Sequence, residues 1–292
     1  MRICTYNVRN LFLDDAANAG VDVEPVARDP YYTKSPAEFR SLVKTIGRVN
    51  ADVLCLQEVS SLASLEKLNA ELERPLPHVG FLPGNSNRGI QLAILSRYPL
   101  RLRSHAQLEL TDAAGGPLAE YDSEADAAAE RTVPLRFQRD LLLGEIDAGP
   151  LGQLAIFNTH LKSKTNRPWR LLAADTIRIA ECQAISAIVE NYLERHPNRA
   201  TLLLGDFNDT RNSESLAHLF AMPFTDPLDD QLRRTGRNPS TYWPKRRMRI
   251  DHILVSPAAQ AFVRKDSARI HSSRQAQKAS DHYPVSLDLD LH

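Results

Sequence analysis

The sequence predicts one α/β domain in which two β-sheets pack face to face with helices on the outside. Of its 292 residues, 42% are hydrophobic and 25% are charged, a composition typical of a globular chain. Each half repeats one pattern, at residues 51–58 and 200–208: a short apolar strand after a helix, ending in a carboxylate. No Gly/Ser-rich or Pro-rich linker separates the halves. We therefore expect a single domain over residues 1–292.

The first half of the chain alternates strands with helices. The apolar run at residues 2–8 predicts a strand that ends near Asn7, and a polar stretch follows to about residue 35. Apolar side chains then recur at spacings of three and four over residues 36–49, which predicts a helix. Ser35 followed by Pro36 is typical of a helix start. Further elements are a strand at 52–58, a helix at 61–73 and a strand at 89–96.

The second half contains more strands and one long helix. Strands are expected at 139–146, 153–159, 201–204, 249–256 and 284–289, and the helix at 171–195. A hairpin around Gly149 and Pro150 joins the first two of these strands. The segment 109–130 differs, because it contains seven acidic residues and no Lys or Arg. This composition predicts a long, exposed acidic loop insertion.

Charge, cysteine content and hydropathy exclude several classes of protein. The 36 basic and 36 acidic residues give no net charge, which argues against binding a polyanion through bulk charge. The three cysteines are far apart and do not suit a disulfide framework; Cys4 and Cys55 lie in apolar runs and are expected in the core. No apolar run approaches the ~18 residues of a membrane span. We expect a monomeric cytoplasmic protein without a signal peptide, or a secreted one if a leader was removed.

Polar side chains follow directly after many of the apolar strands. One such residue usually caps a turn, but several from separate segments predict a shared site at the strand ends. Carboxylates without zinc-type Cys/His spacing favour Mg²⁺ or Mn²⁺, and the two histidines can move protons. Because no nucleophile motif is present, water is the expected attacker, and hydrolysis of a phosphate ester is the expected reaction. These residues are Asn7, Glu58, His160, Asp206, Asn208, Asp251, Asp281 and His282.

The segments around these residues resemble the endonuclease/exonuclease/phosphatase superfamily. They occur in the family's order and span nearly the whole chain, at residues 5–8 (TYNV), 56–59 (LQEV), 158–163 (NTHLKS), 204–209 (LGDFND), 249–254 (RIDHIL) and 280–285 (SDHYPV). The resemblance implies a four-layer α-β-β-α sandwich with two mostly antiparallel sheets. It also implies a Mg²⁺-dependent (or Mn²⁺-dependent) enzyme that cleaves phosphodiesters or phosphomonoesters.

The resemblance also implies a role for each matching residue. Glu58 would be the main metal ligand beside Asn7, and Asp281 a further ligand or a contact to metal-bound water. Asp206 would position or deprotonate the attacking water, and Asp251 would hold the ring of His282. We expect Asp206 and the Asp251–His282 pair to share the role of the general base.

Four more residues complete the implied site. Asn208 would contact the scissile phosphate, and His160 would donate a hydrogen bond or proton on its other side. Arg88 and Lys162 are candidate phosphate contacts. Relatives of pancreatic deoxyribonuclease support this first histidine with a Glu, but residues 84–93 contain no carboxylate here. The expected substitutes are Asn87 or Gln91.

Two other features bear on the substrate. Arg9 disfavours the exonuclease III branch, and residues 7–12 and 160–164 are more similar to bacterial extracellular-nuclease-type members. The segment 233–249 holds seven basic residues and no acidic one, with Tyr242 and Trp243 among them. This pattern suits a polyanion whose bases can stack, and we expect the segment to overhang the site.

Three functions follow from these observations. The first is a nuclease without sequence specificity that acts on DNA or RNA. The second is a phosphomonoesterase, or a phosphodiesterase of small molecules or phospholipids. The third, of a different class, is a non-catalytic binding protein on the same fold.

Overall fold

The computed structural model describes residues 1–13, 33–149, 152–245 and 248–290. The polar stretch at 14–32, Pro150 of the expected hairpin, and the bases Arg246 and Arg247 lie outside these residues. None of the helices in the described part of the chain is long and apolar enough to cross a membrane.

The first sheet has the strand order β12-β13-β1-β2-β4-β3. All neighbouring strands in it are antiparallel except β1 and β2, which are parallel. Its strands are β1 (Arg2–Leu11), β2 (Val53–Val59), β3 (His78–Phe81), β4 (Gln91–Ser96), β12 (Arg269–Ile270) and β13 (Val285–Asp288).

The second sheet has the strand order β11-β10-β9-β8-β5. Here β9 and β10 form the one parallel pair among otherwise antiparallel neighbours in the described chain. Its strands are β5 (Leu100–Ser104), β8 (Leu141–Asp147), β9 (Gln153–His160), β10 (Ala200–Asp206) and β11 (Asp251–Val255).

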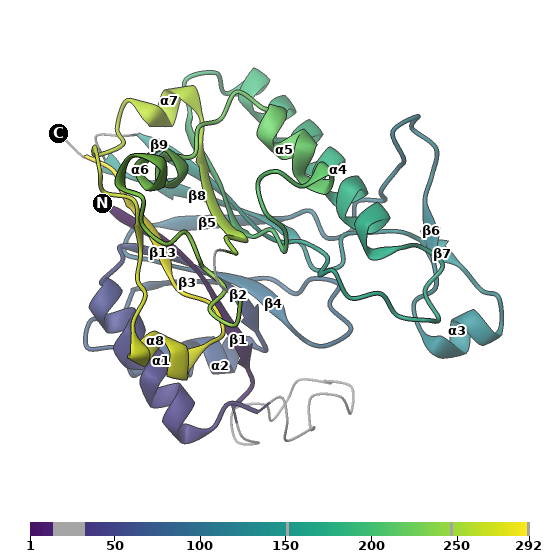
Figure 1. The fold of residues 1–292 in the computed structure, drawn as a ribbon, viewed down its shortest axis with the longest axis horizontal. Helices are drawn as coiled ribbons and strands as arrows, with labels where there is room; N and C mark the ends of the chain where they lie inside the picture. Colours follow the sequence, from purple (N-terminus) through teal and green to yellow (C-terminus); the bar gives the residue numbers. More distant parts are fainter. Residues whose placement is uncertain (14–32, 150–151, 246–247, 291–292) are drawn as a thin grey trace.

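Helices cover the outer face of each sheet, so the molecule has four layers (Figure 1). On the first sheet lie α1 (Pro36–Val49), α2 (Leu62–Ala70) and α8 (Arg274–Ala279), and on the second lie α4 (Ala174–Arg195) and α5 (Ala217–Ala221). The turn η3 (Glu214–Leu216) and the helices α6 (Pro227–Thr235) and α7 (Pro257–Gln260) follow in the second half. The sandwich predicted from the sequence is therefore confirmed.

Three apolar clusters hold these layers together. The central one lies between the sheets and includes Ile3 of β1 and Ile156 of β9. The other two join each sheet to its helices, through Leu42 of α1 on one side and Ile177 of α4 on the other. Because burial of apolar area is the main stabilising term in folding, these clusters fix how the strand ends of the two sheets face each other.

Local signals read from the sequence form as expected. The Ser35 side chain accepts a hydrogen bond from the backbone of Glu38, and the Glu38 carboxylate accepts one from Ser35, which completes a capping box at the start of α1. Cys4 and Cys55 are buried free thiols in β1 and β2, as predicted.

The acidic segment at 109–130 is more ordered than a long exposed loop. It contains β6 (Ala119–Glu120) and α3 (Glu124–Ala128), and β6 pairs with β7 (Val133–Pro134). Glu120 is buried, and its carboxylate accepts hydrogen bonds from the backbone of Leu171 and Leu172. The expectation of full exposure is wrong for this residue, because its charge holds the chain that leads into α4.

Candidate active site

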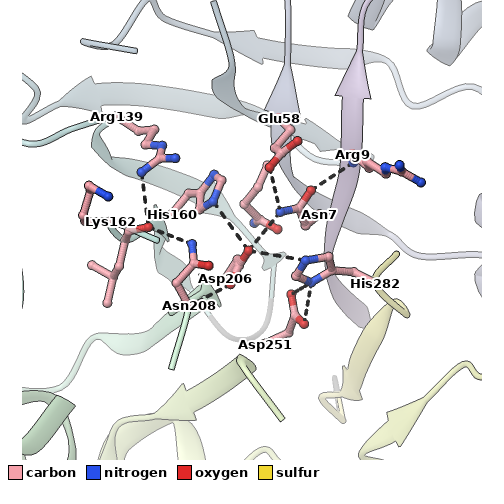
Figure 2. Close-up of polar contacts among 12 residues, drawn as sticks. Asn7, Arg9, Glu58, Arg139, His160, Lys162, Asp206, Asn208, Asp251 and His282 are labelled. Atoms are coloured by element: carbon pink, nitrogen blue, oxygen red, sulfur yellow. Dashed lines mark hydrogen bonds and ion pairs between the residues drawn. The ribbon is translucent and has the colours of Figure 1, made fainter. Parts of the chain in front are cut away.

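The functional side chains converge where strands of both sheets end (Figure 2). Asn7 and Glu58 come from the parallel strands β1 and β2 of the first sheet. His160 and Asp206 end the parallel strands β9 and β10 of the second sheet, where they face each other in register. Asp251 begins β11 and is paired with Asp206 in the antiparallel register. Parallel pairing thus brings residues from distant segments to the same end of each sheet, where the parallel strands finish.

Gly205 permits the close approach of β10 to β9 just before Asp206. Its φ is +139°, and a Cβ atom there would lie 1.9 Å from the carbonyl oxygen of Thr159. Only glycine accommodates that contact. The glycine in the LGDFND segment is therefore required to place Asp206 opposite His160.

One carboxylate oxygen of Asp206 lies among nitrogen atoms from three separate segments of the chain. Its Oδ2 is 2.9 Å from Asn7 Nδ2, 3.5 Å from His160 Nε2 and 3.7 Å from His282 Nε2. The other oxygen, Oδ1, accepts a 2.8 Å hydrogen bond from the backbone N–H of Asn208. Burial raises the pKa of Asp206 and Asp251 adds to the rise, while His282 acts to lower it.

His282 lies between two carboxylates. Its Nδ1 is 2.9 Å from Asp251 Oδ2, and its Nε2 faces Asp206. Burial acts to lower the pKa of His282, but Asp251 and Asp206 outweigh it and raise that pKa above the ordinary value. Asp251 therefore fixes the orientation of the ring, as the sequence predicted for this pair.

His160 has an environment different from that of His282. The ring is buried, and its Nδ1 has no hydrogen-bond partner among the described residues. Burial lowers its pKa well below the ordinary value, and Arg139, His282 and Arg88 lower it further. The expectation that Asn87 or Gln91 supports this ring is wrong, since Nδ1 bonds to neither of them in the described chain, and Gln91 instead accepts a hydrogen bond from the backbone of Gly84. His160 is thus a neutral ring whose Nε2 faces Asp206.

Glu58 provides a carboxylate at the end of β2. Its φ is +67°, a conformation that costs energy for a residue with a side chain and concentrates at functional sites. Its Oε1 is 3.3 Å from Asn7 Nδ2, and its Oε2 accepts a 2.9 Å hydrogen bond from the backbone of Asn10. Carboxylate and amide groups of this kind fit a hard divalent cation.

Asp281 is not joined to that pair. It lies next to His282, and within the described chain its carboxylate accepts a hydrogen bond from the Ser280 hydroxyl rather than contacting Glu58 or Asn7. A separate set of ligand atoms, from Asp206, Asp251 and His282, lies within 4.8 Å of one another. His282 Nδ1 is hydrogen-bonded to Asp251, and its Nε2 faces Asp206 as an ion pair. These contacts already account for the closeness of the three side chains.

The expected phosphate contacts lie beside the centre and already donate hydrogen bonds within the chain. The Asn208 amide donates to the carbonyl oxygen of Leu161 at 2.9 Å. The Lys162 ammonium donates to the carbonyl oxygens of Ser163 and Thr165, at 2.9 and 2.7 Å. Lys162 therefore shapes its own loop, and burial lowers its pKa to about 8. Arg88 reaches the side chain of Asn10 at 3.0 Å.

The segment 233–249 lies against the site, but several of its charges are neutralised. Arg233 and Arg249 pair with acidic residues of α6 and its cap, and Arg234 pairs with Asp266. The aromatic part does meet the centre, since the ring of Tyr242 lies 5.2 Å from that of His282. Three of the seven bases expected to meet a polyanion, Arg233, Arg234 and Arg249, are therefore already paired with carboxylates.

A buried arginine that the sequence did not single out connects two loops of the site. Arg178 of α4 is fully buried and donates to the carbonyl oxygen of Lys162 at 2.8 Å and to Asp209 at 3.1 Å. It thereby links the loop after His160 to the turn after Asp206. An arginine on the apolar face of a predicted helix was the signal available in the sequence.

Arg178→Met is expected to destabilise the protein by about 3–5 kcal/mol, because it removes one of the two cations that pair with the buried Asp209 carboxylate, the other being Lys164, together with the hydrogen bond to the carbonyl oxygen of Lys162. Denaturant unfolding measures the change. Arg195→Met on the same helix is the matched control, since Arg195 is exposed and its loss should change stability by less than about 0.5 kcal/mol. Equal stability of the two variants would contradict this role for Arg178.

Together the four-layer fold and this cluster of carboxylate, amide and imidazole groups define a class of α/β hydrolases that act on phosphoric esters. The family model for the Endonuclease/Exonuclease/phosphatase family matches residues 4–282, so the chain belongs to this family. Members of this family are phosphoric ester hydrolases, and the chain is an enzyme of that kind.

Solved structures share the fold at low sequence identity. The human Nocturnin catalytic domain with bound sulfate has a TM-score of 0.62 and 18% identity, over 99% of this chain and 94% of that one. An endonuclease/exonuclease/phosphatase from Beutenbergia cavernae gives 0.59 and 19%, over 100% and 71%. The 3′ phosphatase NExo from Neisseria, bound to a product DNA hairpin, gives 0.58 and 17%, over 100% of both chains. No curated protein matches the chain.

Proposed function

We propose that this enzyme is a nuclease that hydrolyses phosphodiesters by attack of water in the presence of Mg²⁺ or Mn²⁺. The observation that carries the proposal is the position of Asp206 Oδ2, which is surrounded by Asn7, His160 and His282. A buried carboxylate with several polar neighbours is suited to orient a water molecule and accept its proton.

Each neighbouring group has a distinct part in this proposal. Glu58 and Asn7 would hold the cation, which when bound polarises the phosphate oxygens. Asp206 positions the water, and His282, oriented by Asp251, faces the same oxygen and shares the proton. His160 donates a hydrogen bond from Nε2 to a phosphate oxygen, because a neutral ring retains one N–H donor. Asp281 adds negative charge beside His282 and helps to raise its pKa.

A phosphomonoesterase is the second candidate. It is favoured by the similarity in fold to NExo, which is a 3′ phosphatase bound to product DNA. Both candidates place a nucleic acid phosphate at the same centre and differ in whether one or two ester groups flank the phosphorus. The monomeric state and the cytoplasmic location stay predictions from the sequence.

A substrate panel distinguishes these candidates. Single- and double-stranded DNA, RNA, bis-nitrophenyl phosphate, nitrophenyl phosphate and sphingomyelin are each tested with Mg²⁺ and with Mn²⁺. We expect the diesters to be turned over faster than nitrophenyl phosphate. Faster turnover of the monoester would replace the nuclease assignment with the phosphatase one, and preference for sphingomyelin would reject both.

Chelation with EDTA is expected to stop turnover in this panel, and added Mg²⁺ or Mn²⁺ to restore it, because the proposed centre requires a divalent cation. The measurement is the initial rate before chelation, after chelation and after the cation is returned. Full activity in EDTA would contradict the metal-dependent mechanism.

A further inference from the structure

A pocket of about 210 Å³ opens beside the loop that follows His160 and is strongly basic. None of its described lining residues is acidic, while half of them are basic: Arg88, Arg139, Lys162, Arg167 and Arg170. We call this cavity the basic pocket. Such an excess of one charge in a concave site attracts anions.

The basic pocket adjoins the proposed catalytic centre through a shared backbone group. Arg139 Nη1 lies 3.4 Å from the carbonyl oxygen of Leu161, and Asn208 Nδ2 lies 2.9 Å from the same oxygen. In Figure 2, Arg139 and Lys162 lie on the side of His160 opposite to His282 and Asp251. An anion in the basic pocket would therefore be a close neighbour of the phosphate at the centre.

Arg139 is a buried cation that makes no ion pair at contact distance in the described chain, although Glu181 and Glu58 act on its charge from further away. Arg139 is 8% exposed, and its guanidinium group donates a long hydrogen bond to the carbonyl oxygen of Leu161. No carboxylate oxygen among the described residues lies within 4.0 Å of its guanidinium group. Burial lowers the pKa of Arg139, and Glu181 and Glu58 offset this only in part. A bound anion would offset the remaining cost of burial.

Arg170 is similarly incomplete. Its Nε and Nη1 atoms are buried and have no hydrogen-bond partner in the described chain, and Glu120 lies 3.7 Å from Nη1. Since a guanidinium group has five N–H donors, donors remain for a further acceptor at the basic pocket.

The loop that lines one wall is held in place. Arg167 and Arg170 both lie over the ring of Trp169, at 5.8 and 5.2 Å from its centroid. Lys162 binds two carbonyl oxygens of the same loop, as described above. A preorganised set of cations loses little freedom when an anion binds.

We propose that the basic pocket binds a second phosphate group of the substrate, beside the phosphate that is hydrolysed. The substrate class is then a chain with at least two phosphates, such as an oligonucleotide, and the inference rests on the proposed function. A second pocket of about 400 Å³ shares Asn87, Gln138 and Arg170 with the first. It offers space for the sugar and base that follow the second phosphate.

Dinucleotides with and without an additional phosphate test this proposal. The kcat/KM of dithymidine with only its internal phosphodiester is compared with that of the 5′-phosphorylated and the 3′-phosphorylated forms. We expect one added phosphate to raise kcat/KM about tenfold through a lower KM, as a charge-assisted contact allows. In Arg167→Ala this gain should fall severalfold. Arg101→Ala removes an exposed arginine of β5 outside the lining of the basic pocket and should keep the gain.

The salt dependence of KM gives a second measure. Arg167→Ala should reduce the slope of log KM against log salt concentration by about one for the phosphorylated dinucleotide. One outcome of the rate comparison separates the two proposals. Cleavage of all three dinucleotides with equal kcat/KM would overturn the second phosphate site and would leave the proposed nuclease function intact.

Titration calorimetry measures ligand affinity at the basic pocket without turnover. The wild-type chain in EDTA is titrated with the phosphorylated and unphosphorylated dinucleotides, and the phosphorylated ligand should bind about tenfold more tightly. That preference should fall severalfold in Arg167→Ala and persist in Arg101→Ala. Equal affinities in the wild type, or an unchanged preference in Arg167→Ala, would overturn the proposal even if no dinucleotide is hydrolysed.

Discussion

Asp206→Ala is expected to lower kcat by about 10³-fold, the effect of removing a positioned acid–base group. The reason is local, because the substitution removes the oxygen that faces Asn7, His160 and His282. The measurement is the steady-state rate on bis-nitrophenyl phosphate with saturating Mg²⁺ or Mn²⁺.

The fold should survive this substitution. Asp206 is buried, and burial raises its pKa, so the ionised carboxylate is held at a cost in folding free energy. The thermal unfolding midpoint of Asp206→Ala should therefore stay close to that of the wild type. Asp230→Ala, which removes an exposed carboxylate of α6, is the control and should keep full activity. A folded Asp206→Ala enzyme with wild-type kcat would exclude Asp206 from the mechanism.

Glu58→Gln is expected to raise the Mg²⁺ or Mn²⁺ concentration for half-maximal rate at least about tenfold, because hard cations prefer charged oxygen ligands. Glutamine keeps the size of the side chain and an oxygen at the same position, so the backbone at φ +67° is not changed. The measurement is the initial rate as a function of cation concentration.

A matched control and an alternative outcome sharpen this test. Glu66→Gln removes an exposed carboxylate of α2 and should leave the cation requirement unchanged. If Glu58→Gln also leaves it unchanged, Glu58 is not the principal ligand. The cation would then be assigned to the Asp206, Asp251 and His282 set, whose ligand atoms lie within 4.8 Å of one another.

Local patterns predicted most of the main elements of the fold. The helix expected at 36–49 is α1 with the bounds Pro36–Val49, because its start is encoded in the adjacent Ser35, Pro36 and Glu38. The sequence interpretation lacked the short strands β3, β5 and β12. They have only four, five and two residues, too short for a clear periodic signal although β5 alternates Leu and Arg, and pairing with neighbouring strands stabilises them.

The candidate site was predicted in its residues more completely than in its contacts. Asn7, Glu58, His160 and Asp206 lie at one site, since the last three are at or next to a strand end and Asn7 precedes the irregularity in the pairing of β1 with β2. Asp281 does not join Glu58, although it is adjacent in sequence to His282. Neighbouring residues leave a strand end in different directions, so proximity in sequence does not decide which of them faces the centre.

By itself the sequence determined the order of the main elements, the sandwich and the set of reactive side chains, because periodicity and motifs are properties of nearby residues. Tertiary structure alone decided which basic residues remain available to a substrate. Arg234 and Arg249 are neutralised by Asp266 and Asp226, while Arg139 is buried with no carboxylate oxygen of the described residues within 4.0 Å. An ion pair depends on two residues that the folded chain brings within a few ångströms. That distance cannot be inferred from the local sequence around either residue.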